Sequence, residues 1–345
     1  MYNMLTGVDL AKKEIQVCVA KSNKIVRNMP MTPTAFSNWL ATQKPMTVVF
    51  EACATSNYWY QCAREYGHDA RLISAKLVSN IRQNQKTDKN DAEAVLQASQ
   101  LSNVNFISGK SKEQQELQSL VRMHQLSVKH KVAYGNQLCS LLLEFNIKLS
   151  PTDAGLNSAI QSILEDAENG FSAIFREALH TAWHQYLKSI ELVKHYEKSV
   201  ARASRASEAC KNLMKIEGVG PTNAVNLYIA LGCCELGVFK KARDAAFGIG
   251  LTPIQHSSGG KVRLGSIGKN IRNSSLRANL VAGAMSAINQ AVKRDSRTKK
   301  DEWIKGLVER RGKRCAAVAL ANKTVRTAFS LLRNGTDYKA ELLSA

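Results

Sequence analysis

The first 110 residues alternate short apolar runs with stretches that have helical spacing. Runs of this length predict β-strands, and Gly67 ends a helical stretch just before the last of them. The predicted strands cover residues 5–8, 15–19, 47–50 and 69–73, and the predicted helices cover residues 34–42 and 56–66. Alternating strands and helices are typical of an α/β fold, so we expect residues 1–110 to form an α/β domain with a mixed sheet.

Residues 111–210 change to long stretches with helical spacing of apolar positions. These positions recur from Leu117 to Phe145 and again from Phe171 to Val200, with a break at residues 150–155 that contains Pro and Gly. Two long helices that return on each other predict an antiparallel coiled-coil arm. Its expected roles are spacing and self-association.

Four acidic residues stand where strands end or a helix begins. Asp9 ends the first apolar run, Glu51 ends the third, and Asp88 and Asp91 open a helical stretch. Residues three apart share a helix face, so Asp88 and Asp91 can point at one spot. Converging carboxylates repel one another unless a hard divalent cation binds them, so the pattern favours a metal site. The alternatives are that each Asp forms a turn or that Asp88 caps the helix.

The distribution of charge along the chain predicts a polyanionic partner. The chain carries a formal net charge of +20, and residues 211–345 hold 24 basic against 9 acidic side chains, a net +15, whereas residues 111–210 hold 11 of each. Such a segment usually faces nucleic acid. No apolar run approaches the length of a membrane span and no secretion signal is present, so we expect a cytoplasmic protein without a membrane partner. The eight cysteines lack the spacing of a zinc site.

Two glycine-containing segments in residues 211–345 suit contact with phosphates. Gly218 and Gly220 lie between two predicted helices, which resembles a helix-hairpin-helix that binds the DNA backbone through its N–H groups. We expect a later segment to be a flexible basic loop with a serine hydroxyl at its tip. Its key residues are Ser257, Ser258, Gly259, Gly260, Lys261, Arg263 and Lys269. A serine here can be a nucleophile if it is activated, or the segment can simply bind phosphate.

Several motifs occur together in one order: Gly7-Val8-Asp9, Phe50-Glu51-Ala52, Lys86-Thr87-Asp88-Lys89-Asn90-Asp91-Ala92, Ile216 to Thr222, and Gly250 to Lys261. This combination resembles the DEDD-type insertion-sequence transposases, the family that includes the Piv site-specific invertase and the bridge-RNA-guided serine recombinases. The resemblance covers nearly the whole chain. It implies a RuvC-like domain with a ribonuclease H fold (residues 1–110), the coiled-coil arm (111–210) and a mostly α-helical transposase domain (211–345).

The resemblance also implies a chemistry. Asp9, Glu51, Asp88 and Asp91 would bind Mg²⁺ (or Mn²⁺), and Ser258, with Ser257 as the close alternative, would form a transient 5′-phosphoserine bond to DNA. Further implied partners are donor and target DNA, a guide (bridge) RNA and further copies of the chain in a dimer of dimers, in a bacterial, nucleoid-associated setting. The segment Ser266 to Asn273 departs from the family pattern, which leaves the phosphate contacts of Lys269 open. The alternative functions are a RuvC-like metal-dependent nuclease such as a junction resolvase, and a non-catalytic nucleic-acid scaffold.

Overall fold

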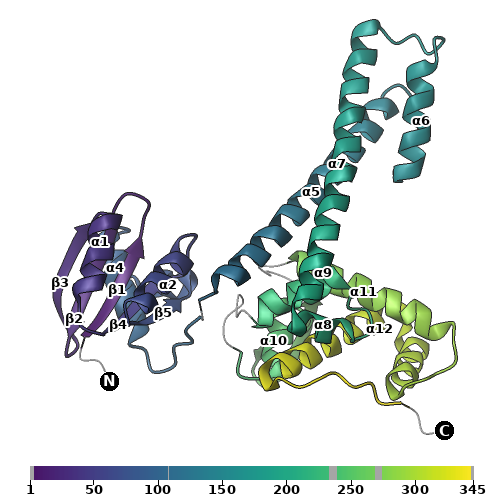
Figure 1. The fold of residues 1–345 in the computed structure, drawn as a ribbon. Helices are drawn as coiled ribbons and strands as arrows, with labels where there is room; N and C mark the ends of the chain where they lie inside the picture. The colour runs from purple at the N-terminus through teal and green to yellow at the C-terminus, as the bar shows by residue number, and fades with distance from the viewer. Residues whose placement is uncertain (1–3, 108, 233–238, 269–273, 343–345) are drawn as a thin grey trace. The chain divides into compact units, whose positions relative to one another are not determined.

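The computed structural model describes residues 4–107, 109–232, 239–268 and 274–342 (Figure 1). It separates two compact units, one of residues 1–115 and 212–345 and the other of residues 116–211. Within the described ranges, no helix combines the length and apolarity needed to cross a membrane.

The N-terminal part contains a five-stranded sheet in the order β3-β2-β1-β4-β5. β1, β2 and β3 form an antiparallel meander, and β4 and β5 run parallel to β1. The strands are β1 (Met4–Leu10), β2 (Ile15–Lys21), β3 (Lys24–Met31), β4 (Thr47–Glu51) and β5 (Asp69–Ile73). The mixed sheet is confirmed, and it has the arrangement of a ribonuclease H-like fold. The predicted strands do not include β3, because this edge strand is largely exposed and lacks buried apolar positions.

Helices cover both faces of this sheet. On one face, Phe36 and Trp59 pack against Val8 and Phe50 of the strands, and on the other face Val78 and Val95 pack against Val49 and Ile73. The helices are α1 (Pro33–Thr42) and α2 (Ser56–Glu65) on the first face, and α3 (Ala75–Ile81) and α4 (Asp88–Ser99) on the second. The sheet is therefore the middle of three layers (Figure 1).

The backbone of α4 lies very close to β1. A Cβ atom at Gly7 would lie 2.6 Å from the carbonyl oxygen of Ala92 and 2.6 Å from the amide nitrogen of Leu96. Both neighbours are backbone atoms that cannot move aside without shifting the helix. Glycine at position 7 therefore sets how closely the first turns of α4 approach the sheet.

The unit of residues 116–211 is built on α5 (Lys112–Leu143) and α7 (Ala173–Ala206), with an unpredicted α6 (Asp153–Glu165) beside them. His124 of α5 lies 4.0 Å from Glu197 of α7, and Gly135 faces Tyr186, so the two long helices run antiparallel. An apolar cluster joins all three helices through Leu138, Leu142, Leu156, Ile160, Leu179, Trp183 and Tyr186.

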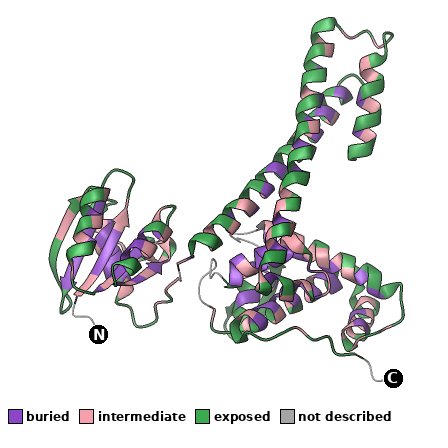
Figure 2. Cartoon of the chain, viewed as in Figure 1, coloured by how far each residue is buried: buried purple, intermediate pink, exposed green. Residues whose placement is uncertain are grey.

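The seam between α5 and α7 differs from the predicted apolar stripe. Buried, intermediate and exposed residues follow one another along α5 and α7 (Figure 2). Outside the three-helix cluster the buried positions of the seam include Gln118, His124 and Ser127, whereas the predicted stripe residues Met123 and Leu126 are about half exposed. The antiparallel pairing agrees with the predicted arm. The coiled-coil geometry itself stays a prediction.

The described C-terminal part is mostly helical, as predicted. Its helices are α8 (Glu208–Met214), α9 (Pro221–Leu227), a π-helical turn (Tyr228–Gly232), α10 (Ala242–Ile249), α11 (Ser274–Val292) and α12 (Lys299–Asn334). A two-stranded hairpin, β6 (Pro253–Ser258) and β7 (Lys261–Ile267), interrupts them. α12 breaks at Gly312, whose φ of 77° and ψ of 165° are not helical.

We predict that Gly7→Ala lowers the stability of the N-terminal fold by about 1–3 kcal/mol, the usual cost of overpacking, because the new methyl group must push α4 away from β1. Differential scanning calorimetry of the full chain measures the effect. Gly306→Ala is the matched control, since position 306 lies inside α12 with open space around it and helical alanine is favourable there. Equal melting of the Gly7→Ala variant and the unmodified chain would show that α4 can shift at no cost.

Candidate active site

Asp9 and Glu51 lie at one edge of the sheet, on adjacent strands. β1 and β4 are parallel with Val8 opposite Phe50, so Asp9 and Glu51 follow at neighbouring positions. Val8 and Phe50 point into the core beneath α1 and α2. Side chains alternate along a strand, so Asp9 and Glu51 point to the other face, where α4 packs.

α4 brings Asp88 and Asp91 to the same face in its first turn. Thr87 caps this helix, because its side chain accepts a hydrogen bond from the Asn90 amide at 3.3 Å. The alternative that Asp88 is the cap is therefore wrong. Asp91 is buried, at 7% exposure, whereas Asp88 is exposed. Negative charge in the first turn also suits the partial positive charge of a helix N-terminus.

The electrostatics of the acids show that they act on one another. Burial raises the pKa of Asp9 above its ordinary value, and the negative charges of Asp91 and Asp88 raise it further. Burial likewise raises the pKa of Glu51, with Asp9 and Asp91 adding to the effect. A hydrogen bond with the backbone of Leu10 and the charge of Lys86 oppose the shift of Asp9, and the charges of Lys86 and Arg82 oppose that of Glu51. Ionisation of Asp9 and Glu51 therefore lowers the stability of the fold, and a bound cation would offset this loss.

The donor set suits a hard divalent cation, since all four groups offer carboxylate oxygens. As the side chains stand, the described residues contain no group of three or more His, Cys, Asp or Glu close enough together to hold an ion. Asp91 instead forms an ion pair with Arg82, with Nη1 2.7 Å from Oδ1. The backbone thus gathers the four acids at one edge, and their side chains would have to move before they could share one ion. Nothing in the sequence marks Arg82, which lies outside every motif.

The Gly-x-Gly segment is shaped first by packing. Gly218 has a φ of +79°, and a Cβ atom there would lie 2.6 Å from the carbonyl oxygen of Gly283 in α11. This contact explains the glycine without a phosphate. Gly220 is exposed and immediately precedes Pro221, the first residue of α9. A role of Gly218 and Gly220 in binding nucleic acid stays a prediction.

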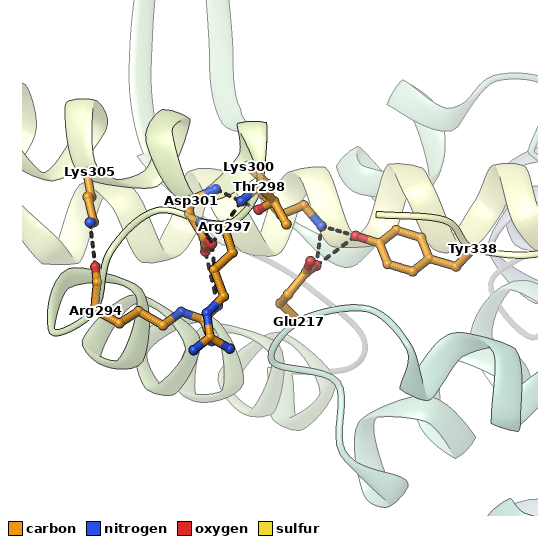
Figure 3. A network of polar contacts seen from close by, with 8 residues as sticks. All are labelled: Glu217, Arg294, Arg297, Thr298, Lys300, Asp301, Lys305 and Tyr338. Atoms are coloured by element: carbon orange, nitrogen blue, oxygen red, sulfur yellow. Dashed lines mark hydrogen bonds and ion pairs between the residues drawn. The ribbon is translucent and has the colours of Figure 1, made fainter. Parts of the chain in front are cut away.

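A polar network fixes the start of this segment (Figure 3). The Glu217 carboxylate accepts hydrogen bonds from Lys300 at 2.5 Å and from the Tyr338 hydroxyl at 2.8 Å. Burial opposes the charge of Glu217, yet the Lys300 hydrogen bond and other favourable contacts hold the pKa of Glu217 below its ordinary value. The segment is thereby joined to the first turn of α12 and to the C-terminal stretch. Lys300 and Tyr338 carry no signal in the sequence that marks this role.

The two serines lie on a β-hairpin, and the expectation of a flexible loop is wrong. Gly259 and Gly260 form the turn, with φ of 55° and 76°, values that glycine adopts easily and that suit a two-residue hairpin. Ser258 pairs with Lys261 at the end of β6. The mixture of serine, glycine and charged residues resembles a loop because every residue of β7 and most of β6 are exposed, so no apolar side of a strand is visible.

The register of this hairpin separates the two serines. His256 pairs with Arg263 and Ser258 with Lys261, so these four side chains share one face. Ser257 pairs with Val262 on the opposite face and accepts a hydrogen bond from Gln255 at 2.9 Å. Among the described residues, the Ser258 side chain has no hydrogen-bond partner. Lys269 lies outside the described residues.

Two protein-family models match this chain. A family model described as "Transposase", of the DEDD type, matches residues 6–147, and a second, described as "Transposase IS116/IS110/IS902 family", matches residues 210–300. The "Transposase for insertion sequence element IS1111A" of Coxiella burnetii is 31% identical over 97% of this chain and 91% of its own length.

Two further relatives match over most of both chains. The "Probable family 20 transposase" of Pseudomonas aeruginosa is 31% identical over 96% of this chain and 98% of that protein. The "Transposase for insertion sequence element IS1328" of Yersinia enterocolitica is 28% identical over 97% of this chain and 98% of that protein. With the acids at the sheet edge and matches at both ends of the chain, the protein belongs to the IS110/IS1111 family of DEDD transposases and is the DNA-cutting transposase of an insertion sequence.

Proposed function

We propose that this transposase cuts and rejoins DNA strands through a 5′-phosphoserine bond at Ser258, with Mg²⁺ (or Mn²⁺) held by Asp9, Glu51, Asp88 and Asp91. The observation that carries the proposal is the placement of Asp9 and Glu51 on adjacent parallel strands beneath the first turn of α4. Residues 1–110, 111–210 and 211–345 would act as the metal-binding domain, the arm and the DNA-joining domain.

The four acids would share the binding of the cation, and their proposed roles follow from their positions. Asp9 and Glu51 come from the rigid sheet, whereas Asp88 and Asp91 come from the helix that packs on it. A bound divalent ion would polarise the scissile phosphate and stabilise developing negative charge on its oxygens. The raised pKa values of Asp9 and Glu51 are what a cation-free cluster of this kind would have.

Ser258 is the preferred nucleophile because of the hairpin face on which it lies. In the proposed step its hydroxyl oxygen bonds to phosphorus as the bond from phosphorus to the 3′ oxygen breaks, and the serine proton passes to a base while the 3′ oxygen leaves as a hydroxyl. A 3′ hydroxyl of the new partner strand then attacks phosphorus and releases the serine, so the phosphodiester energy is conserved. Lys261 and Arg263 on the same face suit the negative charge of the phosphate.

Donor and target DNA would bind the basic C-terminal part, and the family resemblance supports a guide (bridge) RNA that selects both sites by base pairing. Strand exchange between two duplexes needs more than one active site, which supports assembly as a dimer of dimers through the arm.

The break in α12 offers one surface for a phosphate backbone. Arg311 and Arg314, on either side of Gly312, are exposed and have no side-chain partner among the described residues.

We predict that Asp9→Asn, Glu51→Gln, Asp88→Asn and Asp91→Asn each abolish Mg²⁺-dependent strand cleavage while DNA binding persists, because each change removes ligand charge and little volume. Cleavage of an end-labelled element terminus on a denaturing gel measures the loss. Normal cleavage by any two of the variants would contradict a shared site.

Thermal melting in EDTA is the fold control for these variants. The raised pKa values of Asp9 and Glu51 mean that these carboxyl groups hold their protons more tightly in the folded chain than in the unfolded chain. The fold therefore loses stability as pH rises from the ordinary pKa of the two groups through their raised pKa. Above the raised pKa values the cost is fully present, and at such a pH Asp9→Asn should therefore melt at a higher temperature than the unmodified chain without metal.

The serine assignment predicts different outcomes for two neighbouring substitutions. Ser258→Ala should lose both covalent adducts and strand joining yet still bind DNA, whereas Ser257→Ala, which alters the opposite face of the hairpin, should retain at least partial activity. Mass spectrometry of a trapped protein–DNA adduct locates the phosphoryl bond. An adduct on Ser257 would overturn the assignment, and cleavage by Ser258→Ala without any adduct would favour the metal-dependent nuclease.

Arg311→Gln combined with Arg314→Gln should weaken duplex binding and make its salt dependence shallower. The logarithmic slope of affinity against salt should fall by roughly 0.9 for each DNA phosphate that the protein no longer neutralises. Fluorescence anisotropy of a labelled duplex over a salt series measures both quantities. Lys198→Gln with Arg202→Gln, which removes the same charge from exposed positions of α7, is the matched control. An equal change of slope in the two double variants would show that net charge alone is responsible.

A further inference from the structure

Arg82 is the cation that contacts the proposed metal site directly. It follows α3 and its backbone amide donates to the carbonyl of Val78, which fixes where its side chain starts. From there the guanidinium reaches the first turn of α4 and pairs with Asp91 at 2.7 Å. Within the described residues, this is the one ion pair formed by any of the four acids.

The pair is sheltered from solvent. The side chains of Arg82 and Asp91 are 22% and 11% exposed. A sheltered pair is screened far less than a surface pair, and removing one partner of a buried pair leaves an uncompensated charge. Loss of Arg82 would therefore leave the Asp91 carboxylate partly buried without its cation.

The geometry of the contact leaves half of the carboxylate available. Arg82 donates from Nη1 to Oδ1 alone, and Oδ2 of Asp91 has no hydrogen-bond partner among the described residues. A bidentate pair would have engaged both oxygens. One oxygen is thus held by the protein, and the other remains available to a cation.

We propose that Arg82 is a positioning residue that holds Asp91 by Oδ1 so that Oδ2 is directed at the divalent cation. This inference rests on the proposed metal site. Hydrogen-bonded partners of metal-ligating carboxylates fix their orientation, and loss of such a partner typically costs 10- to 100-fold in metal affinity. The opposite expectation is that Arg82 only competes with the ion, in which case its removal would tighten metal binding.

The test is Mn²⁺ binding by the full-length chain, measured by isothermal titration calorimetry without DNA. Arg82→Met keeps an unbranched apolar stem in place of the arginine methylene chain and removes the guanidinium donors, so we expect Mn²⁺ affinity to fall by about 10- to 100-fold. Arg82→Lys, which restores a single donor, should recover part of the loss. Arg71→Met is the matched control, because Arg71 of β5 pairs with Asp69 at 2.6 Å and forms no ion pair with any of the four acids.

Each outcome separates the two proposals. Suppose that the unmodified chain binds Mn²⁺ and Asp9→Asn does not. Unchanged or tighter Mn²⁺ binding by a folded Arg82→Met variant then overturns the role of Arg82 and leaves the metal site intact. An absence of Mn²⁺ binding to the unmodified chain overturns the metal site itself. Circular dichroism checks the fold of Arg82→Met. If Arg82→Met does not fold, Arg82→Lys decides the question. The positioning role is contradicted if Arg82→Lys binds Mn²⁺ as tightly as the unmodified chain while Asp91 has a changed orientation in its Mn²⁺-bound crystal structure.

Discussion

The arrangement of the four candidate active-site acids depends on the close approach of two backbones. Gly7 lets α4 pack against β1 at a distance that no side chain would permit. Two pairs of acids with very different origins, one at strand ends and one in the first turn of a helix, are thereby brought to one edge of the sheet. Since the sheet and α4 belong to a packed three-layer core, the position of these carboxylates is fixed by apolar contacts far more than by contacts among the acids themselves.

Two of the four acids, Asp9 and Glu51, lower the stability of the fold when they are ionised. Asp9 and Glu51 are partly buried and repel their acidic neighbours, which raises the pKa of both groups. Such a cost is common at functional sites, where charge is arranged for chemistry and the surrounding core supplies the stability. Arg82 offsets the charge of Asp91 alone. In the proposed metal site, the remaining negative charge would favour the binding of a cation.

The C-terminal part uses different means to hold its elements. The backbone of Gly218 lies against that of Gly283, and the carboxylate of Glu217 accepts hydrogen bonds from Lys300 and Tyr338, so the glycine segment is anchored at two points (Figure 3). The serine hairpin is held by its strand register and by a turn of two glycines. Its register decides which side chains surround each serine, and a shift by one residue would exchange the faces of Ser257 and Ser258.

By itself, the sequence determined the α/β character of the N-terminal part and the four candidate acids, because period, strand ends and Asp-x-x-Asp spacing are local properties. The mostly helical C-terminal part was expected from the family resemblance. The tertiary structure decided what depends on contacts between distant residues. Arg82 meets Asp91 only through the path of the chain between α3 and α4, and edge strand β3 is defined by its pairing with β2. The exposed hairpin that holds Ser258 lacks a buried face, so no apolar periodicity could reveal it.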